Sequence, residues 1–542
     1  MNKTVFLILL STIIAIGCGK KTETNVEYGY ANKILYIANQ DEPQAIDPHL
    51  FTGIPDRNIA LALFEGLVTL DSKTLKPLPA ASESWTISDD LTTYTFQLRK
   101  NARWSNGDMV TAEDFVYGWR RALTPTLPNL YAYLMYYVVN AEAYHRGEIT
   151  DFSQVGIKAL SPSQLQVTLN HPTNFFLQMI DHHSFYPVHR TTIEQHGGID
   201  DALSKWTRPE NFVGNGPFTL KSWQVNKEIA VQKNPHYWDA DNVFLNEVHF
   251  LPITDQQVEV RAFRTGQVHL TNTPQMAIEK IAFFREKQPE ALRITATYST
   301  YFYYFNTTIE PLNDARVRRA IAMAIDRDLI VEKVTKGGEV PAYSIIPVDP
   351  NGYKPNTYFK FDIEEAKKLL AEAGYVNGKG FPTFEILYNT NDNHRKVAVA
   401  IQQMLKQNLN IDVQLINKEW KVYLDEMAHL RHDIARGGWI ADYIDPTNFF
   451  TLLLSSAGNN RTGWKNADYD ALLKAMEREP DDQKRYAIFE QANKMLSEAM
   501  PLMPIYYYSD INVVDPNIEG WYDNAMHYHP YQYVKFKNTT EK

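Results

Sequence analysis

The sequence predicts an α/β protein with two to four domains. Its 542 residues are too many for one hydrophobic core, and 44% hydrophobic with 22% charged residues is an ordinary globular composition. From about residue 300 onward, strand patterns alternate with helical patterns, which predicts βαβ units and mainly parallel strand pairing. Before residue 300, short strand patterns are separated by turn signals.

The charge excludes one broad class of partner. The chain has a net charge of −10, whereas nucleic-acid-binding proteins have an excess of basic residues. A nucleic acid is therefore not expected as a partner. Aromatic residues make up 13% of the chain, with 32 tyrosines. Tyrosine suits binding surfaces because it combines contact area with a hydroxyl group, and it also fills cores.

The N-terminus has the features of an export signal. Lys3 precedes an apolar run over residues 5–16, and small residues follow, so residues 1–17 are predicted to be a cleaved signal peptide. Cys18 is the only cysteine, which excludes an intrachain disulfide. Residues 18–32 are mostly polar and without periodicity, and they are predicted to be a flexible tether.

The next elements are predicted from local patterns. They are a buried strand at 33–39, turns at 47–49 and 53–55, and a helix at 59–65 that ends at Gly66. Further along are strands at 94–99 and 164–169, a hairpin turn at Asn106-Gly107, and a helix that begins with the capping pair Thr111 and Asp114.

The second half repeats a strand–helix order. Strands are predicted at 301–306, 384–388, 411–415 and 504–508, and the chain then returns through residues 521–534. One helix is expected from a cap at Asn313 to Ile325, a second from Asp362 to Gly374, and a third over 396–406.

The segment 436–448 carries the strongest candidate for a site. Two glycines and a tryptophan precede Asp442, and Pro446 ends the regular structure. If the carboxylate of Asp442 is buried, it needs a cationic partner, because an unpaired buried charge is very costly. Spacing alone leaves a solvated surface loop equally open.

This segment, together with blocks at 64–68, 81–85, 94–99, 104–107, 111–115, 213–218 and 234–238, resembles the bacterial oligopeptide-binding proteins. These are extracytoplasmic receptors of peptide ABC importers. The resemblance implies a type II periplasmic-binding-protein-like fold, with two lobes hinged around a ligand cleft plus an extra α/β domain. It places the first lobe at 33–64, 189–299 and 510–542, the extra domain at 65–188, and the second lobe at 300–509.

The resemblance also implies site residues. Asp442 matches the aspartate that pairs with the α-ammonium of a bound peptide, and Arg436 and His394 match cations near the peptide carboxylate. The remaining matches are backbone or aromatic contacts: Gly438, Trp439, Ile440, Gly53, Ile54, Tyr131, Trp420 and Tyr508. Ala15-Ile16-Gly17-Cys18 resembles a bacterial lipobox, which implies lipidation of Cys18 and a monomer anchored outside the cytoplasm by lipid alone.

No enzyme motif is present. The chain has no Gly-x-Ser-x-Gly, no phosphate loop and no His-Glu-x-x-His, so a binding protein without cofactor or metal is expected. The pairs His182-His183 and His527/His529 are predicted to be surface or supporting histidines rather than metal ligands. Alternatives are a dipeptide, murein-peptide, nickel or haem-binding relative, a secreted hydrolase, or a surface adhesin on the same fold.

Overall fold

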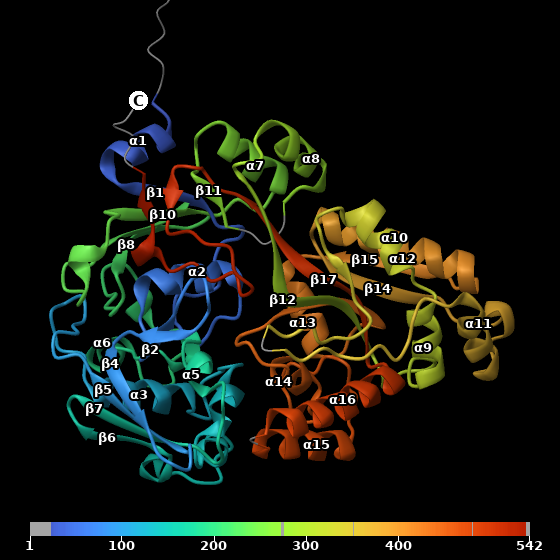
Figure 1. Ribbon diagram of the computed structural model, residues 1–542, viewed down its shortest axis with the longest axis horizontal. Helices are drawn as coiled ribbons and strands as arrows, with labels where there is room; N and C mark the ends of the chain where they lie inside the picture. The colour runs from blue at the N-terminus through green and yellow to red at the C-terminus, as the bar shows by residue number, and fades with distance from the viewer. Residues whose placement is uncertain (1–22, 273–275, 351, 480, 538–542) are drawn as a thin grey trace, which may run out of the picture.

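The computed structural model describes residues 23–272, 276–350, 352–479 and 481–537, and three large sheets organise them (Figure 1). On the left of Figure 1, a five-stranded sheet lies above a four-stranded sheet; on the right is a six-stranded sheet. We call the five-stranded sheet with its helices the first lobe, the four-stranded sheet with its helices the four-stranded domain, and the six-stranded sheet with its helices the second lobe.

The sheet of the first lobe mixes parallel and antiparallel pairs. Its order is β11 (Leu270–Thr271), β1 (Ile34–Ala38), β10 (Glu247–Leu251), β9 (Glu228–Lys233) and β8 (Phe218–Gln224). β1 is parallel to both of its neighbours, and all of its residues are buried, which confirms the predicted first strand.

The four-stranded domain is an antiparallel sheet covered by α3 (Ala112–Ala122). Its order is β4 (Ser82–Ile87), β5 (Thr93–Leu98), β7 (Gln164–Thr168) and β6 (Ile157–Ser161). Burial alternates along β5 and β7, and the capping box of Thr111 and Asp114 begins α3, so these predictions are confirmed.

The sheet of the second lobe corrects a prediction. Its order is β13 (Val340–Pro341), β17 (Leu502–Val513), β12 (Leu292–Phe305), β16 (Ile434–Ile440), β14 (Phe384–Asn389) and β15 (Val413–Lys418). β14 is parallel to β15 and β16, but β12 is antiparallel to β16 and β17. Mainly parallel pairing is therefore wrong, since three of the five strand pairs in this sheet are antiparallel. Hydrophobic periodicity contains no information on strand direction.

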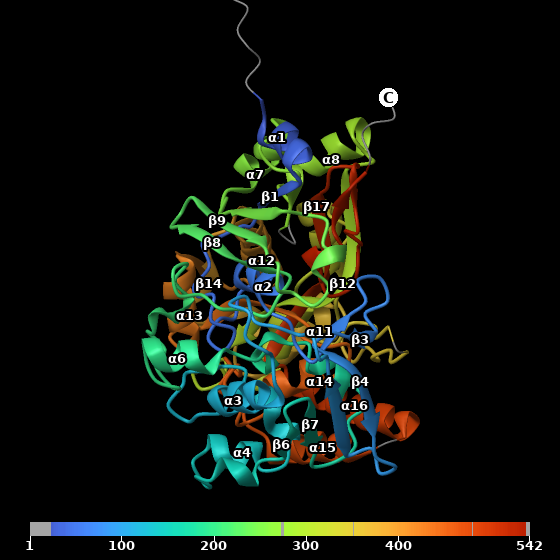
Figure 2. The same cartoon turned by 90° about the vertical axis from the view of Figure 1, so that its left-hand side faces the viewer.

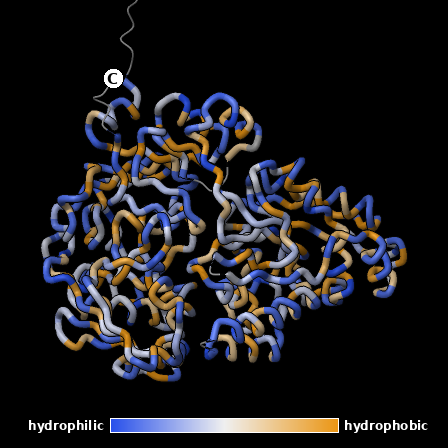
Figure 3. The backbone as a smooth tube through the Cα atoms, viewed as in Figure 1, coloured by the Kyte–Doolittle hydropathy of each residue, from blue (hydrophilic) through white to orange (hydrophobic). Residues whose placement is uncertain are grey.

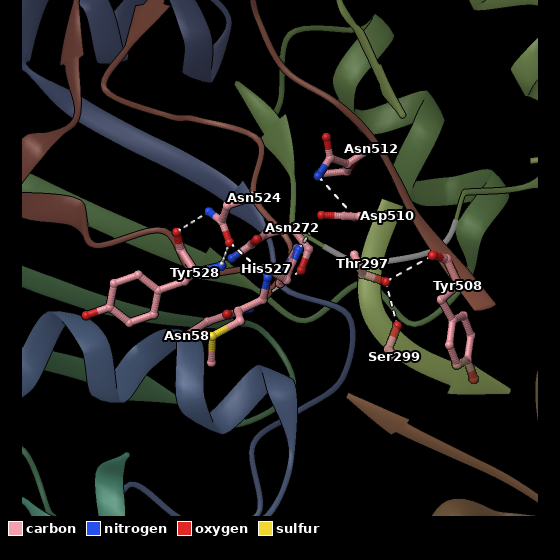
Figure 4. Close-up of polar contacts among 12 residues, drawn as sticks. Asn58, Asn272, Thr297, Ser299, Tyr508, Asp510, Asn512, Asn524, His527 and Tyr528 are labelled. Atoms are coloured by element: carbon pink, nitrogen blue, oxygen red, sulfur yellow. Dashed lines mark hydrogen bonds and ion pairs between the residues drawn. The ribbon is translucent and has the colours of Figure 1, made fainter. Parts of the chain in front are cut away.

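Strands β12 and β17 connect the two lobes. They run side by side in both views (Figures 1 and 2), and an isolated bridge joins Val514, just past β17, to Leu270 of β11. Their pairing is interrupted where residues 297–299 of β12 lie opposite Tyr508. There the Thr297 hydroxyl donates to the Tyr508 carbonyl at 3.1 Å and lies 2.5 Å from the Ser299 hydroxyl (Figure 4). β12 crosses the predicted domain boundary at 299/300, and β17 crosses the one at 509/510. The other domain boundaries remain predictions.

The described residues also form further α-helices and two small strand pairs. They are α1 (Asn25–Asn32), α2 (Ile54–Leu63), α4 (Ala141–His145), α5 (Phe176–Met179), α6 (Arg190–His196), α7 (Gln256–Arg264), α8 (Ile278–Lys287), α9 (Ala315–Met323), α10 (Arg327–Leu329), α11 (Ile363–Glu372), α12 (Asp392–Leu409), α13 (Trp420–Ala428), α14 (Thr447–Phe450), α15 (Ala467–Arg478), α16 (Asp482–Ala499), β2 (Val68–Leu70) with β3 (Pro77–Pro79), and β18 (Ile518–Glu519) with β19 (Lys535–Phe536).

Three helix starts differ from the predictions. α2 begins at Ile54 rather than residue 59, because Pro55 fits the first turn of a helix. Asp314, not Asn313, caps α9. The Asn391 side chain caps α12, so His394 lies in the first turn of a helix and not in a loop.

The predicted tether is wrong in its last part, where residues 25–32 form α1. A capping box of Thr24 and Glu27 begins this helix, and the Asn25 side chain donates to the Gln267 carbonyl at 3.2 Å. The predicted signal peptide and Cys18 lie outside the described residues.

Hydrophobic residues connect the parts of the molecule. Figure 3 shows hydrophobic and hydrophilic residues alternating along the outer helices, as expected of helices with one buried face. One core cluster includes residues of both lobes, and the core of the four-stranded domain includes Tyr443 from the second lobe. Among the described helices, none has the length and apolar character needed to cross a bilayer.

Candidate functional site

Asp442 lies between the second lobe and the four-stranded domain. It follows β16 by two residues, and its side chain is 12% exposed. Next to it, the ring of Tyr443 stacks on Phe175 of the four-stranded domain, with centroids 4.7 Å apart and planes at 5°. The carboxylate is therefore enclosed by two parts of the molecule that are far apart in sequence.

The surroundings of this carboxylate favour its neutral form. Burial raises the pKa of Asp442 to about 7, while Asn448 and Arg57 act in the opposite direction. Its Oδ1 lies 3.6 Å from His182 Nε2, and its Oδ2 is buried without a hydrogen-bond partner among the described residues. Burial, His183 and Arg57 hold the pKa of His182 well below its usual value, so this imidazole is neutral.

Neutral groups position Asp442. The Asn448 side-chain oxygen accepts hydrogen bonds from Trp439 Nε1 at 2.6 Å and from the backbone N–H of Asp442 at 3.3 Å. The ring of Tyr131 lies 4.5 Å from His182. No described lysine or arginine comes within ion-pair distance of the Asp442 carboxylate. A ligand cation is the partner that this arrangement favours.

β16 has a free backbone edge beside Asp442. On one side, residues 434–440 pair with β12; on the other side, β14 pairs only with Ile434 and Ala435. Within the described chain, residues 436–440 thus have no strand on their second side. The Arg436 carbonyl accepts from the Tyr423 hydroxyl there. An extended ligand could pair with Gly438 and Ile440 along this edge as an additional strand.

Because Gly438 has no side chain, the Tyr508 hydroxyl and the Arg436 guanidinium lie close to the backbone of β16. A Cβ at this position would lie 2.5 Å from the Tyr508 hydroxyl and 3.1 Å from the Arg436 guanidinium. Both contacts are shorter than ordinary van der Waals separations, so a larger residue would displace those side chains.

Arg436 forms the centre of a second polar cluster. Its guanidinium donates to the Tyr508 hydroxyl and lies 4.8 Å above the Tyr301 ring. Although burial acts against the charged form, the surrounding tyrosine hydroxyls raise the pKa of Arg436. No described carboxylate forms an ion pair with Arg436, so this cation is available to a ligand anion.

His394 belongs to the Arg436 cluster. Its ring centroid lies 5.6 Å from that of Tyr301. Burial and the nearby Arg436 hold the pKa of His394 well below its usual range, so the imidazole is neutral at pH 7. His394 can act on a ligand as a hydrogen-bonding group rather than as the cation that the sequence resemblance implied.

The remaining predicted residues lie at the margins of these clusters. Trp420 is 36% exposed and stacks on Tyr423 with centroids 5.5 Å apart, which connects it to the Arg436 cluster. Gly53 and Ile54 begin α2, close to Phe51, whose ring centroid lies 4.0 Å from that of His183. The structure thus joins Asp442, Trp439 and Tyr131 in one group. It joins Arg436, Gly438, Tyr508, His394 and Trp420 in another.

Four contributors were not predicted from sequence. His182 and His183 are buried, which corrects the surface alternative for this pair. Asn448 is also buried, and its position beside Phe449 and Phe450 was a signal that its amide needs a partner. Arg57 stands on α2 and acts on Asp442 and His182 from a distance, which no local pattern indicates.

Comparison with known proteins places these features in a wider group. Residues 76–461 match the family described as "Bacterial extracellular solute-binding proteins, family 5 Middle". The chain is 37% identical to the periplasmic oligopeptide-binding protein OppA of Salmonella typhimurium, over 95% of this chain and 94% of that protein.

Solved structures agree with the two-lobed arrangement. The structure of the Escherichia coli murein tripeptide binding protein MppA aligns with a TM-score of 0.88 at 33% identity, covering 93% of this chain and 98% of that one. The unliganded open form of MppA aligns with a TM-score of only 0.68, at 33% identity and 93% and 97% coverage. The lobes are therefore arranged more as in the former structure than as in the open form.

Proposed function

Because the chain belongs to the bacterial extracellular solute-binding proteins of family 5, we propose that it binds extended oligopeptides between its lobes and delivers them to the permease of a peptide ABC importer. The relative named oligopeptide-binding protein, similar over nearly the whole chain, supports this ligand class. The proposal includes export by a signal peptide over residues 1–17, lipid anchoring through Cys18 and action as a monomer.

The observation that carries the proposal is the Asp442 carboxylate. It is nearly buried, one of its oxygens has no described partner, and the imidazole beside it is neutral. The α-ammonium of a peptide supplies the missing positive charge and several hydrogen-bond donors. Binding of the ammonium then stabilises the ionised carboxylate, which burial alone disfavours.

The edge of β16 supports an extended peptide as the ligand. Backbone groups of Gly438 and Ile440 can pair with the peptide backbone, whose hydrogen bonds are the same for every sequence. Side chains of the ligand would then alternate away from the edge. Such a receptor accepts many peptides of similar length.

The Arg436 cluster supports recognition of the other end of the peptide. The guanidinium has no described counter-ion, and Tyr508 and His394 lie next to it. A carboxylate that reaches this cluster would form a charge-assisted hydrogen bond with Arg436. The spacing between Asp442 and Arg436 along β16 would then favour short peptides over long ones for this contact.

The decisive experiment compares one peptide with and without its charged terminus. Calorimetry should show that the N-acetylated tripeptide binds about a hundredfold or more weakly than the free tripeptide. Removal of one partner from a buried pair costs ~3–5 kcal/mol, at about 1.4 kcal/mol per tenfold change in affinity. Equal affinities of the two peptides would end the proposal.

Asp442→Asn tests the same contact from the protein side. This variant should lose the discrimination between free and acetylated peptides, whereas Asp89→Asn, at an exposed position, should retain it. Recovery of each peptide intact after prolonged incubation separates a receptor from a hydrolase, and release of shorter products would favour the hydrolase.

A murein tripeptide is the second candidate ligand, because the structure aligns well with a murein tripeptide binding protein. A calorimetric series from dipeptides to hexapeptides, with a murein tripeptide included, distinguishes the two. Binding of the murein tripeptide alone would favour the second candidate.

A further inference from the structure

Outside the Asp442 and Arg436 groups, one buried group has the composition of a metal site. Asp510, His527 and His529 each offer a ligand atom, and the three atoms lie within 4.8 Å of one another. The three side chains are 5%, 1% and 4% exposed, respectively. Asp510 stands on β17, whereas both histidines lie between β18 and β19, so the group joins a lobe-crossing strand to the C-terminal segment.

The backbone that holds the histidines is itself fixed by side chains. The Asn524 side-chain oxygen accepts from the backbone N–H groups of Met526 at 3.1 Å and Tyr528 at 3.0 Å. The Arg57 guanidinium donates to the carbonyls of Met526 at 3.0 Å and His527 at 2.5 Å. Figure 4 shows Asn524 bonded to Tyr528 close to His527. These contacts hold the segment in place independently of any ligand.

His527 has an unusual backbone conformation. Its φ of +50° lies in the left-handed region, which costs a non-glycine residue free energy and is often found at ligand sites. This conformation places the imidazole against β17, where Nδ1 lies 2.6 Å from Asp510 Oδ2. The strained backbone of His527 thus sets the orientation of its imidazole, which is one candidate metal-binding group.

The polar atoms of the group are not all satisfied by the protein. Both ring nitrogens of His529 are buried and have no hydrogen-bond partner among the described residues. The His529 ring lies 4.8 Å from the His527 ring, centroid to centroid, and stacks on Trp521 at 4.0 Å. A buried ring nitrogen without a partner requires an explanation, and a bound ion is one.

We propose that Asp510, His527 and His529 bind one divalent transition-metal ion of the zinc type. Two imidazoles and one carboxylate form a ligand set that suits zinc, whereas calcium and magnesium require mainly oxygen ligands. The Asp510 carboxylate offsets part of the charge of the ion, which replaces the proton shared by Asp510 Oδ2 and His527 Nδ1. Three protein ligands leave one coordination position for a water molecule.

The three residues of this site are separate from the Asp442 and Arg436 groups. Arg57 approaches both places, because it donates to the His527 carbonyl and also acts on Asp442, and Asp510 follows Tyr508 on β17. The bound ion would connect β17 to the segment that packs on the first lobe, where the Tyr531 ring lies 5.4 Å from Phe250. Metal binding should therefore raise the melting temperature without a requirement for peptide.

The test uses the protein without an affinity tag, stripped of metal with EDTA and free of peptide. Calorimetric titration with zinc sulfate should give one ion per chain, and added zinc should raise the melting temperature. Magnesium should do neither. Cobalt should give the strong visible absorption of a four-coordinate nitrogen and oxygen site, rather than the weak bands of six-coordinate surface cobalt.

Variants assign the site to these residues. His527→Gln together with His529→Gln should abolish zinc binding and the cobalt spectrum, whereas His236→Gln, at an exposed position, should leave both unchanged. Unchanged zinc binding by a folded double variant, or only weak cobalt bands with the unmodified protein, would overturn the proposal. If the double variant does not fold, the cobalt spectrum of the unmodified protein still decides. Peptide binding is measured separately, so failure of one assignment leaves the other standing.

Discussion

At the scale of single residues, burial keeps the Asp442 side chain protonated at pH values where a solvated aspartate is ionised. Burial raises its pKa from the usual 3.8 to about 7, and the nearest imidazole, His182, is neutral. Because the folded-state pKa exceeds the unfolded value, the folded protein retains a proton between about pH 4 and 7 that the unfolded chain has lost. The contribution of Asp442 to stability thus decreases as pH rises through this window and is not recovered above it.

The same pKa predicts how peptide affinity depends on pH. Below about pH 7, a peptide ammonium must displace a proton from Asp442, so affinity should decrease by up to about tenfold per pH unit as pH falls. Above about pH 8 the peptide α-amino group itself loses its proton, and affinity should decrease again. Calorimetry between pH 5 and 9 should give a bell-shaped profile for the unmodified protein. The Asp442→Asn variant should lack the acid limb, and a flat profile for the unmodified protein would contradict this account.

The ligand-free protein should gain stability from the same substitution. The asparagine side chain cannot ionise, so Asp442→Asn should raise the free energy of unfolding at pH 8 by up to about 4 kcal/mol, about three pKa units at about 1.4 kcal/mol each. The difference should fall below about 1 kcal/mol near pH 4, where the folded-state carboxyl group is neutral and about half of the unfolded-state groups are. Urea unfolding at the two pH values measures it, and a variant less stable than the unmodified protein at pH 8 would refute the explanation.

At the scale of elements, the edge of β16 depends on glycine. Gly438→Ala places a methyl group 2.5 Å from the Tyr508 hydroxyl and 3.1 Å from the Arg436 guanidinium. Displacement of these groups should cost about 1–3 kcal/mol in peptide binding, or roughly fivefold to a hundredfold in affinity. Gly458→Ala is the matched control, since nothing lies within 4 Å of an added methyl group there. Equal peptide affinities of the two variants would show that the Gly438 position is not part of the binding edge.

Sequence patterns identified elements with clear local signals. The alternation in β5 and the cap of α11 by Asp362 were predicted from neighbouring residues, and the structure confirms them. β12 and β17 were predicted too short, because the aromatic residues 301–305 are buried on both faces and the strand has an irregularity at 297–299. The start of α12 was also missed, although Asn391 is a strong capping residue.

The candidate site could be predicted only in part, since its residues come from distant segments. Asp442 and Arg436 were found because one continuous segment resembles a known motif. His182 and Arg57 act on Asp442 from distant segments that only the fold brings together, whereas Asn448 lies six residues away in the same segment. The neutral state of His394 likewise depends on burial beside Arg436, which the sequence does not show.

At the scale of the whole molecule, contacts between the four-stranded domain and the second lobe should stabilise the closed form. The Phe175 ring of the four-stranded domain stacks on Tyr443 of the second lobe. Phe175→Ala removes an aromatic pair that contributes about 0.5–1.5 kcal/mol beyond its buried area, so bound peptide should dissociate faster. X-ray scattering should show compaction of the unmodified protein by peptide and a higher peptide requirement for the variant.

The control for this closure experiment is Phe152→Ala. The Phe152 ring packs on Tyr144 with centroids 5.0 Å apart, and both rings belong to the core of the four-stranded domain. This variant should compact at the same peptide concentration as the unmodified protein. Identical behaviour of the Phe175 variant would exclude a role of that stack in closure.

The position of α1 has a mechanical consequence. Its Tyr30 ring lies 4.8 Å from Phe536 near the other terminus, and the helix packs on β1 of the first lobe. A tension applied ahead of Thr24 is therefore transmitted to the first lobe through these contacts. If the protein is attached to a surface at this end, the first lobe is held at the surface and the second lobe is the part that moves.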